Sequence, residues 1–141
     1  MTEKIAAIFR RRVDFAEDGP EESAEDRLRR LVKEGNLSED TISDALAMRD
    51  RDFAAMAVAY LAKTSPEKVL KIFDMQAAKP IVSLAWHAGL SMRMALQLQK
   101  DAGQVPPREI IYPKGGTDYP LSDDAMNWQL EFLGLKKAKK A

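Results

Sequence analysis

Hydrophobic residues recur at helical spacing along most of the chain, and a capping residue precedes most of these stretches. Leu28, Leu31 and Val32 form the first apolar stripe, and Gly35 stands where that helix is expected to end. A serine marks the start of five of the predicted helices, because its side chain can satisfy the free backbone N–H groups of a first turn. The pattern predicts an all-α domain of about seven helices from Ser23 to Gly134. The predicted serine caps are Ser23, Ser38, Ser65, Ser91 and Ser122.

Two of the predicted helices are apolar around almost their whole circumference. One covers Phe53 to Ala62, "FAAMAVAYLA", and the other is "PIVSLAWHA", which Pro80 opens and Gly89 ends. A surface helix needs a polar face, so both helices are expected to be buried. Leu61 and Leu84 are therefore predicted core residues.

The caps also indicate an internal repeat. Ser38, Ser65 and Ser91 are spaced 27 and 26 residues apart, and each unit pairs an amphipathic helix with an apolar one. Such units cannot bury their apolar faces alone and are stable only when they stack. We predict a compact bundle of stacked short helical hairpins, HEAT-like by analogy, although the unit is shorter than a HEAT repeat.

One long stretch carries a family resemblance. It reads "LSEDTISDALAMRDRDFAAMAVAYLAKTSPEKVLKIF", followed by "AGLS" and a further helix, so that it spans Leu37 to Leu98, with an extension to the "WQLEFLG" helix left open. This order of a capped short helix, an "RxxDF"-like joint, an alanine-rich helix, a "xPEKV" helix and an "AGLS" turn resembles the C-terminal helical region of the alphaproteobacterial domain-of-unknown-function family 2336. The chain departs from the family at "DMQAAKP", residues 74–80, where an acidic joint with a glycine is expected. The resemblance implies a helical fold and no known activity.

The chain changes character after Gly103. The stretch "QVPPREIIYPKGGTDYP" has four prolines and two glycines, and only "REIIY" has strand character. A last helix follows Ser122, with Met126, Leu130 and Leu133 on one face. The lysines beyond it are interpreted as a solvated basic tail, residues 135–141.

Charge and composition exclude several functions. The 22 basic and 22 acidic residues cancel, which argues against nucleic acid as a partner because phosphate binding usually needs a net basic surface. The chain has no cysteine, so disulfides, thiolate metal sites and cysteine nucleophiles are excluded. The N-terminus lacks a secretory signal and the apolar helices are too short to cross a bilayer, so we expect a cytoplasmic protein.

His87, the only histidine, is the first candidate for chemistry. A Ser/His/Asp site needs a carboxylate that orients the ring, yet the helical neighbours Ser83, Leu84 and Leu90 include no acid. Ser83, one turn earlier, could accept a hydrogen bond from the ring. We expect His87 to be a packed residue without a catalytic role, and Trp86 to belong to the core or to a hairpin interface.

Metal and anion sites are weakly indicated. The acidic stretches lack the spacing of a calcium loop, and no metal or cofactor is expected. In "PKGGTD", the residues Lys114, Gly115, Gly116 and Thr117 could place backbone amides around an anion. No buried strand precedes this loop and no helix begins at its end, so a plain loop is favoured and ligand binding is the alternative.

The N-terminal segment offers a second candidate. Ile5, Ile8, Phe9 and Val13 follow helical spacing, and Arg10, Arg11 and Arg12 fall beside or opposite that stripe. Residues 13 to 26 then hold seven acids and no base, and include Gly19-Pro20, as is typical of a linker. We expect first that the segment packs on its own bundle. The alternative is that it docks elsewhere, for which we favour a protein groove over a membrane surface because the stripe is short.

The predicted organisation is a basic amphipathic segment with an acidic linker (1–22), a helical domain (23–134) and a basic tail (135–141). No catalytic set emerges, so the leading hypothesis is a non-enzymatic module that binds another protein, with self-association left open. The alternative is a small regulatory domain that binds an anionic ligand or nucleotide through residues 114–117. An enzyme of unknown chemistry comes third.

Overall fold

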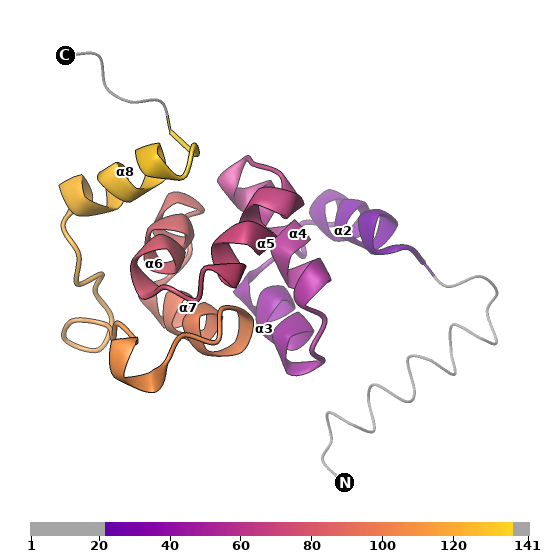
Figure 1. Cartoon of the computed structure of the whole chain (residues 1–141). Helices are drawn as coiled ribbons and strands as arrows, with labels where there is room; N and C mark the ends of the chain where they lie inside the picture. Colours follow the sequence, from indigo (N-terminus) through magenta and orange to yellow (C-terminus); the bar gives the residue numbers. More distant parts are fainter. Residues whose placement is uncertain (1–21, 137–141) are drawn as a thin grey trace, which may run out of the picture.

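Two apolar helices, α4 (Arg51–Ala62) and α6 (Ala78–His87), lie at the centre of the structure. The computed structural model describes residues 22–136. Helices α2, α3 and α5 pack against α4, whereas α7 and α8 pack against α6, and α4 also contacts α6 (Figure 1). The two helices that the hydrophobic pattern marks as buried therefore form the core, as predicted.

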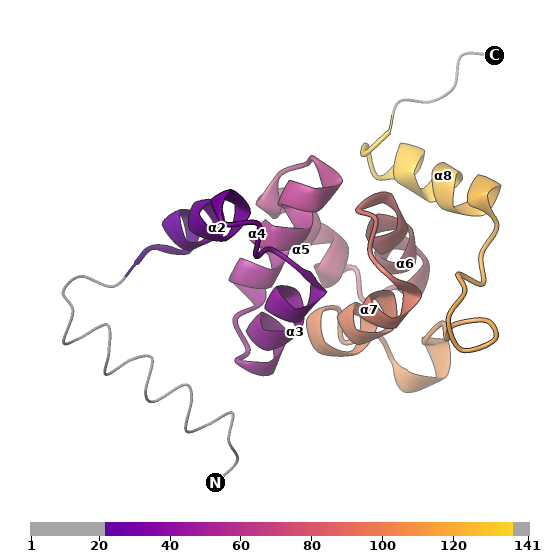
Figure 2. The same ribbon diagram turned by 180° about the vertical axis from the view of Figure 1, so that it is seen from behind.

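The described residues fold into seven α-helices and no β-strand, so the predicted all-α bundle is confirmed. Around α4 and α6 lie α2 (Ala24–Lys33), α3 (Glu39–Ala47), α5 (Pro66–Asp74), α7 (Met92–Gln97) and α8 (Asp123–Phe132). A π-helical turn, Leu98–Ala102, continues α7, and a 3₁₀ turn covers Pro107–Glu109. Figure 2 shows the same bundle from behind, with α2 and α8 again at opposite ends. The internal repeat stays a prediction.

The helix starts follow the predicted caps. At Ser23, Ser65 and Ser122 the side-chain oxygen accepts a hydrogen bond from the backbone N–H three residues on, at 3.1, 3.2 and 3.1 Å. Ser91 does the same for Met94, at 3.1 Å. At Ser38 the backbone N–H donates to Thr41 Oγ1, at 3.2 Å. Local sequence signals thus determine where most helices begin.

The start of α6 differs from the prediction. Pro80 was expected to open this helix, but α6 begins two residues earlier, at Ala78, after Ala77, which offers no capping side chain. A proline is tolerated here because the first four N–H groups of a helix have no intrahelical partner. The helix ends as predicted at Gly89, whose φ of +79° is a left-handed conformation that glycine adopts without strain.

Burial along α4 is nearly complete but not uniform. Phe53, Ala57 and Val58 are fully buried, whereas Tyr60 is 51% exposed and Leu61 is only partly buried. The prediction that Leu61 is a core residue equivalent to Leu84 is therefore wrong. The surrounding helices leave one side of the last turn of α4 open, and an apolar sequence alone does not show which side that is.

A buried glutamine fixes the irregular segment after α7. Gln99, in the π-helical turn, is fully buried, and its Nε2 donates to the Ile111 carbonyl at 2.9 Å. The Ile111 N–H donates to Gln99 Oε1 at 2.8 Å. The stretch "REIIY" thus forms no sheet, because these two backbone groups bond to one side chain.

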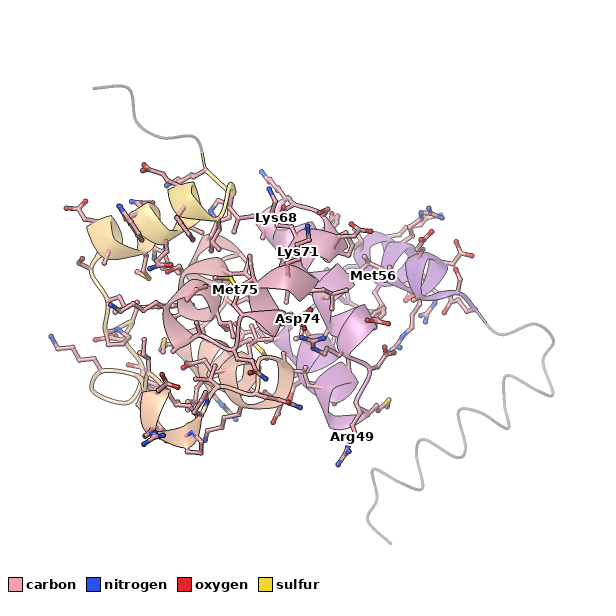
Figure 3. All side chains as sticks on the ribbon, in the orientation of Figure 1. Arg49, Met56, Lys68, Lys71, Asp74 and Met75 are labelled. Carbon is pink, nitrogen blue, oxygen red and sulfur yellow. The ribbon has the colours of Figure 1, made fainter. Side chains whose placement is uncertain are left out.

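Helix α8 covers α6 with the face predicted for it. Met126 and Leu130 are buried, and Leu133 is partly buried against the core. Lys68 of α5, labelled in Figure 3, donates from Nζ to the Gly134 carbonyl at 3.1 Å. The end of α8 is therefore tied to α5 as well as packed on α6.

Leu84 and Leu61 provide a matched test of the core. Leu84→Ala is expected to lower the free energy of unfolding by about 2 to 5 kcal/mol, because Leu84 is fully buried and its truncation leaves a cavity. Leu61→Ala is expected to cost clearly less. Urea unfolding of both variants measures this difference, and equal costs would contradict the assigned core.

The role of Gln99 is tested by a substitution of similar size. Gln99→Leu is expected to cost about 1 to 3 kcal/mol, because the two backbone groups of Ile111 lose their partner. Gln97→Leu is the control, since Gln97 is only partly buried and bonds to the Ser43 hydroxyl at 3.1 Å. Urea unfolding compares them, and a larger loss for the Gln97 variant would refute the assignment.

Candidate interaction site

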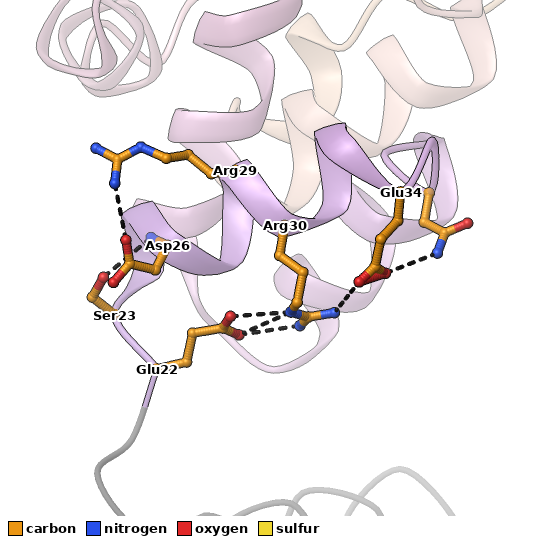
Figure 4. Close-up of polar contacts among 7 residues, drawn as sticks. Glu22, Ser23, Asp26, Arg29, Arg30 and Glu34 are labelled. Atoms are coloured by element: carbon orange, nitrogen blue, oxygen red, sulfur yellow. Dashed lines mark hydrogen bonds and ion pairs between the residues drawn. The ribbon is translucent and has the colours of Figure 1, made fainter.

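The sequence candidate at the N-terminus lies outside the described residues. This applies to Ile5, Ile8, Phe9, Arg10, Arg11 and Arg12. The structure does describe the point where this segment joins the bundle, at Glu22. The Glu22 carboxylate accepts hydrogen bonds from Arg30 Nε and Nη2, at 3.0 and 3.1 Å, which raises the pKa of the guanidinium (Figure 4). The described part of the chain thus begins with Glu22, held to α2 by Arg30.

Helix α2 itself lies on the edge of the bundle. None of its residues is fully buried, and its contact with the core rests on partly buried Leu28 and Leu31. The Arg27 guanidinium also lies over the Phe53 ring, 4.1 Å from its centre. Ion pairs between Asp26 and Arg29 and between Arg30 and Glu34 are exposed (Figure 4) and contribute little to stability.

His87 lies among cations and a carbonyl. Partial burial lowers the pKa of His87 below 6.5, the nearby ammonium groups of Lys136 and Lys63 lower it further, and a hydrogen bond to the Ala62 carbonyl raises it. No carboxylate is among these influences. The Ser83 hydroxyl donates to the Lys79 carbonyl at 2.8 Å. The surroundings lack the acid that a catalytic histidine requires.

Trp86 takes part in the contact between α6 and the residues after α8. It is partly buried against the core, and Lys136 Nζ lies 5.9 Å from the centre of its ring. The same ammonium donates to Asn127 Oδ1 at 2.7 Å. Trp86 thus contributes to packing at this junction, in line with the expected interface role.

The loop of residues 114–117 forms a closed turn. The amides of Thr117 and Asp118 both donate to the Lys114 carbonyl, at 3.3 and 2.9 Å, and the Lys114 amide donates to the Asp118 carbonyl at 2.8 Å. Gly115 and Gly116 have left-handed φ angles of +59° and +86°. Three amides, those of Lys114, Thr117 and Asp118, thus bond within the turn, and anion binding at residues 114–117 stays a prediction.

Among residues 22–136, no group of three or more acidic or histidine side chains is placed to hold a metal ion. Over the same range, no helix combines the length and the apolar character needed to span a membrane.

A polar cluster joins α3, α7 and the loop before α8. The Glu39 carboxylate accepts hydrogen bonds from the Ser91 amide and hydroxyl, at 2.7 and 2.6 Å. The Tyr119 hydroxyl donates to the Leu90 carbonyl at 2.7 Å, and burial, with the Glu39 carboxylate, raises its pKa. Every one of these groups has a partner within the fold, so the cluster is structural.

The outward side of α8 carries large apolar side chains that do not pack in the core. Trp128 and Phe132 are 60% and 69% exposed, and their rings are stacked with centres 5.7 Å apart. The other large exposed apolar side chains are Tyr60, Met75 and Tyr112. Met75, which directly follows α5, lies beside charged Lys71 and Asp74 (Figure 3). In the described residues, only α8 presents two stacked aromatic rings to solvent.

The aromatic pair lies next to acids. At 100° per residue, Asp124 and Glu131 fall on the same side of α8 as Trp128 and Phe132, opposite the buried Met126 and Leu130. The helix contains no basic residue. We call the outward side formed by Asp124, Trp128, Glu131 and Phe132 the α8 face.

Sequence reasoning missed the α8 face. It identified Met126, Leu130 and Leu133 as the packing side of this helix and did not ask what lay opposite. The signal was present, because Trp128 and Phe132 are four residues apart and fall on a second face of the same helix. Helix α8 already has an apolar side that packs on the bundle, so this packing does not require a second pair of aromatic residues on the opposite side.

The chain is thus an all-α bundle whose helix order follows the family resemblance. A bacterial protein family, described as "Uncharacterised protein conserved in bacteria (DUF2336)", matches residues 2–109, and the chain belongs to this family. The match confirms the resemblance and extends it to the N-terminal segment, while α8 lies beyond the matched residues. Searches of curated proteins and of solved structures gave no significant match.

The lowered pKa of His87 predicts a pH dependence of stability. Below pH 6.5 the unfolded chain takes up a proton that the folded chain resists, so stability falls as the pH drops below this value. His87→Gln is expected to weaken this dependence between about pH 7 and pH 5, where histidine ordinarily titrates. Urea unfolding across this range measures the effect, and parallel curves for both proteins would contradict it.

Proposed function

We propose that this protein is a non-enzymatic interaction module that binds another polypeptide through the α8 face. The observation that carries the proposal is the solvent exposure of two stacked aromatic rings, Trp128 and Phe132. The core aromatic residues Phe53 and Phe73 are fully buried, so the fold has the means to cover rings. The exposed pair is therefore available for a partner.

The physical reason is the gain from covering apolar rings. Removing such surface from water is favourable, and aromatic side chains are enriched at protein interfaces and among the residues that dominate binding energy. Asp124 and Glu131 lie beside the rings and make this surface negative, which favours a positively charged partner. A partner with apolar and basic side chains would be complementary, because opposite charges guide association and like charges oppose it.

Two further observations support a binding role over catalysis. His87 lies near Lys63 and Lys136 without an orienting carboxylate. In the turn of residues 114–118, the amides of Lys114, Thr117 and Asp118 bond to carbonyls of that same turn. The features that the sequence offered for chemistry are thus occupied by packing or by local hydrogen bonds, whereas the α8 face has no partner within the described fold.

Site-specific photo-crosslinking tests this function. A photoreactive phenylalanine analogue at position 132, introduced into the full chain in bacterial cells, is expected to give an adduct with a polypeptide. The same analogue at Tyr112 is the matched control, since this aromatic side chain is also exposed, at 56%, but lies outside α8. Mass spectrometry of the adduct identifies the partner.

The possible results separate clearly. An adduct at position 132 that is absent at position 112 supports the α8 face as the interaction site. Equal yields at both positions, or none at position 132, would contradict the proposal. A second copy of the chain and a different protein are both partners under this proposal, and the adduct mass tells them apart.

A further inference from the structure

We propose that the partner on the α8 face is the N-terminal segment of a second copy of this chain. The proposal rests on the interaction role of the α8 face. It commits to residues 4–13, "KIAAIFRRRV", as the occupant. Two such contacts, one in each direction, would relate the copies by two-fold symmetry, as in most homodimers.

The chemistry of the segment matches that of the face. By helical spacing, Ile5, Ile8, Phe9 and Arg12 fall at i, i+3, i+4 and i+7 and share one side of a helix. An apolar stripe with an arginine at its end complements two aromatic rings with adjacent carboxylates. At this spacing Arg11 would fall on another side from Arg12, so the two arginines are not equivalent.

Charge also disfavours the simplest alternative, in which the α8 faces of two copies meet. Helix α8 carries three acids, Asp123, Asp124 and Glu131, and no base. Pairing two such helices would bring like charges together, which opposes association. The nearest base after the helix, Lys136, donates to Asn127 and lies over Trp86, so it is engaged at the junction with α6.

The position of α2 favours a second copy over the same chain. The segment enters the bundle at Glu22, at the start of α2, and Figures 1 and 2 show α2 and α8 at opposite ends. The linker of residues 13–22 reaches at most about 35 Å when fully extended. A compact domain of this size is itself about 35 Å across. A linker that follows the surface of the domain is therefore too short to bring the segment from the start of α2 to the α8 face of the same chain.

Sedimentation velocity of the full chain over a concentration series tests the proposal. The expected result is a reversible dimer with twice the 15.8 kDa mass of the chain, weakened by added salt because charge pairs contribute. Phe132→Ala and Arg12→Glu are each expected to raise the dissociation constant at least about tenfold, as truncation or reversal at an interface centre commonly does. Circular dichroism verifies that the variants keep their helices.

Two matched controls make the test specific. Tyr60→Ala removes an aromatic side chain that is 51% exposed but lies on α4, and Arg11→Glu reverses a charge next to Arg12 on another side of the segment. Both are expected to change the dissociation constant by less than about threefold, since they lie outside the proposed contact.

Other outcomes would overturn the inference. A chain that stays monomeric at every concentration refutes a second copy as the occupant. A dimer that depends on Phe132 but not on Arg12 would indicate contact between two α8 faces. Neither result would refute the proposed function, because crosslinking at position 132 to a different protein would still support it.

Discussion

The constraint on which the structure depends is that α4 and α6 are apolar on nearly every side. A helix of this kind is stable in water only when other elements surround it. Helices α2, α3 and α5 surround α4, and α7 and α8 surround α6. Along the chain, amphipathic helices precede, separate and follow the two apolar ones, which supplies this cover. The consequence for function is that covering helices have a second side, which faces outward.

The polar contacts decide where the last covering helix lies. Gln99 holds Ile111 through two hydrogen bonds, and Tyr119 bonds to the carbonyl of Leu90. These hydrogen bonds fix the position of the proline-rich segment that connects α7 to α8. Helix α8 follows this segment and packs on α6. Met126 and Leu130 then pack inward, which turns Trp128 and Phe132 to solvent. The proposed interaction surface is thus a direct result of how the core is closed.

The sequence predicted what local signals control. Serine caps and apolar spacing located most helices, because a cap and its turn lie within four residues. It did not predict the start of α6, since Ala77 has no capping side chain, nor the exposure of Tyr60, which depends on helices distant in sequence. The partner of Gln99 lies twelve residues away, and only the folded chain shows that the two meet. The spacing of Trp128 and Phe132 is visible in the sequence, but their exposure depends on which sides of α8 the rest of the bundle covers.

The central claim is that the α8 face is covered when the protein binds its partner. Fluorine NMR of the full chain with fluorinated tryptophan tests this most directly, because the chain has two tryptophans, Trp128 on α8 and Trp86 on α6. As the protein concentration rises, the Trp128 resonance, assigned with Trp128→Phe, is predicted to shift while the Trp86 resonance stays in place. A Trp128 resonance that stays unshifted at every concentration, and also in bacterial extract, would contradict the account.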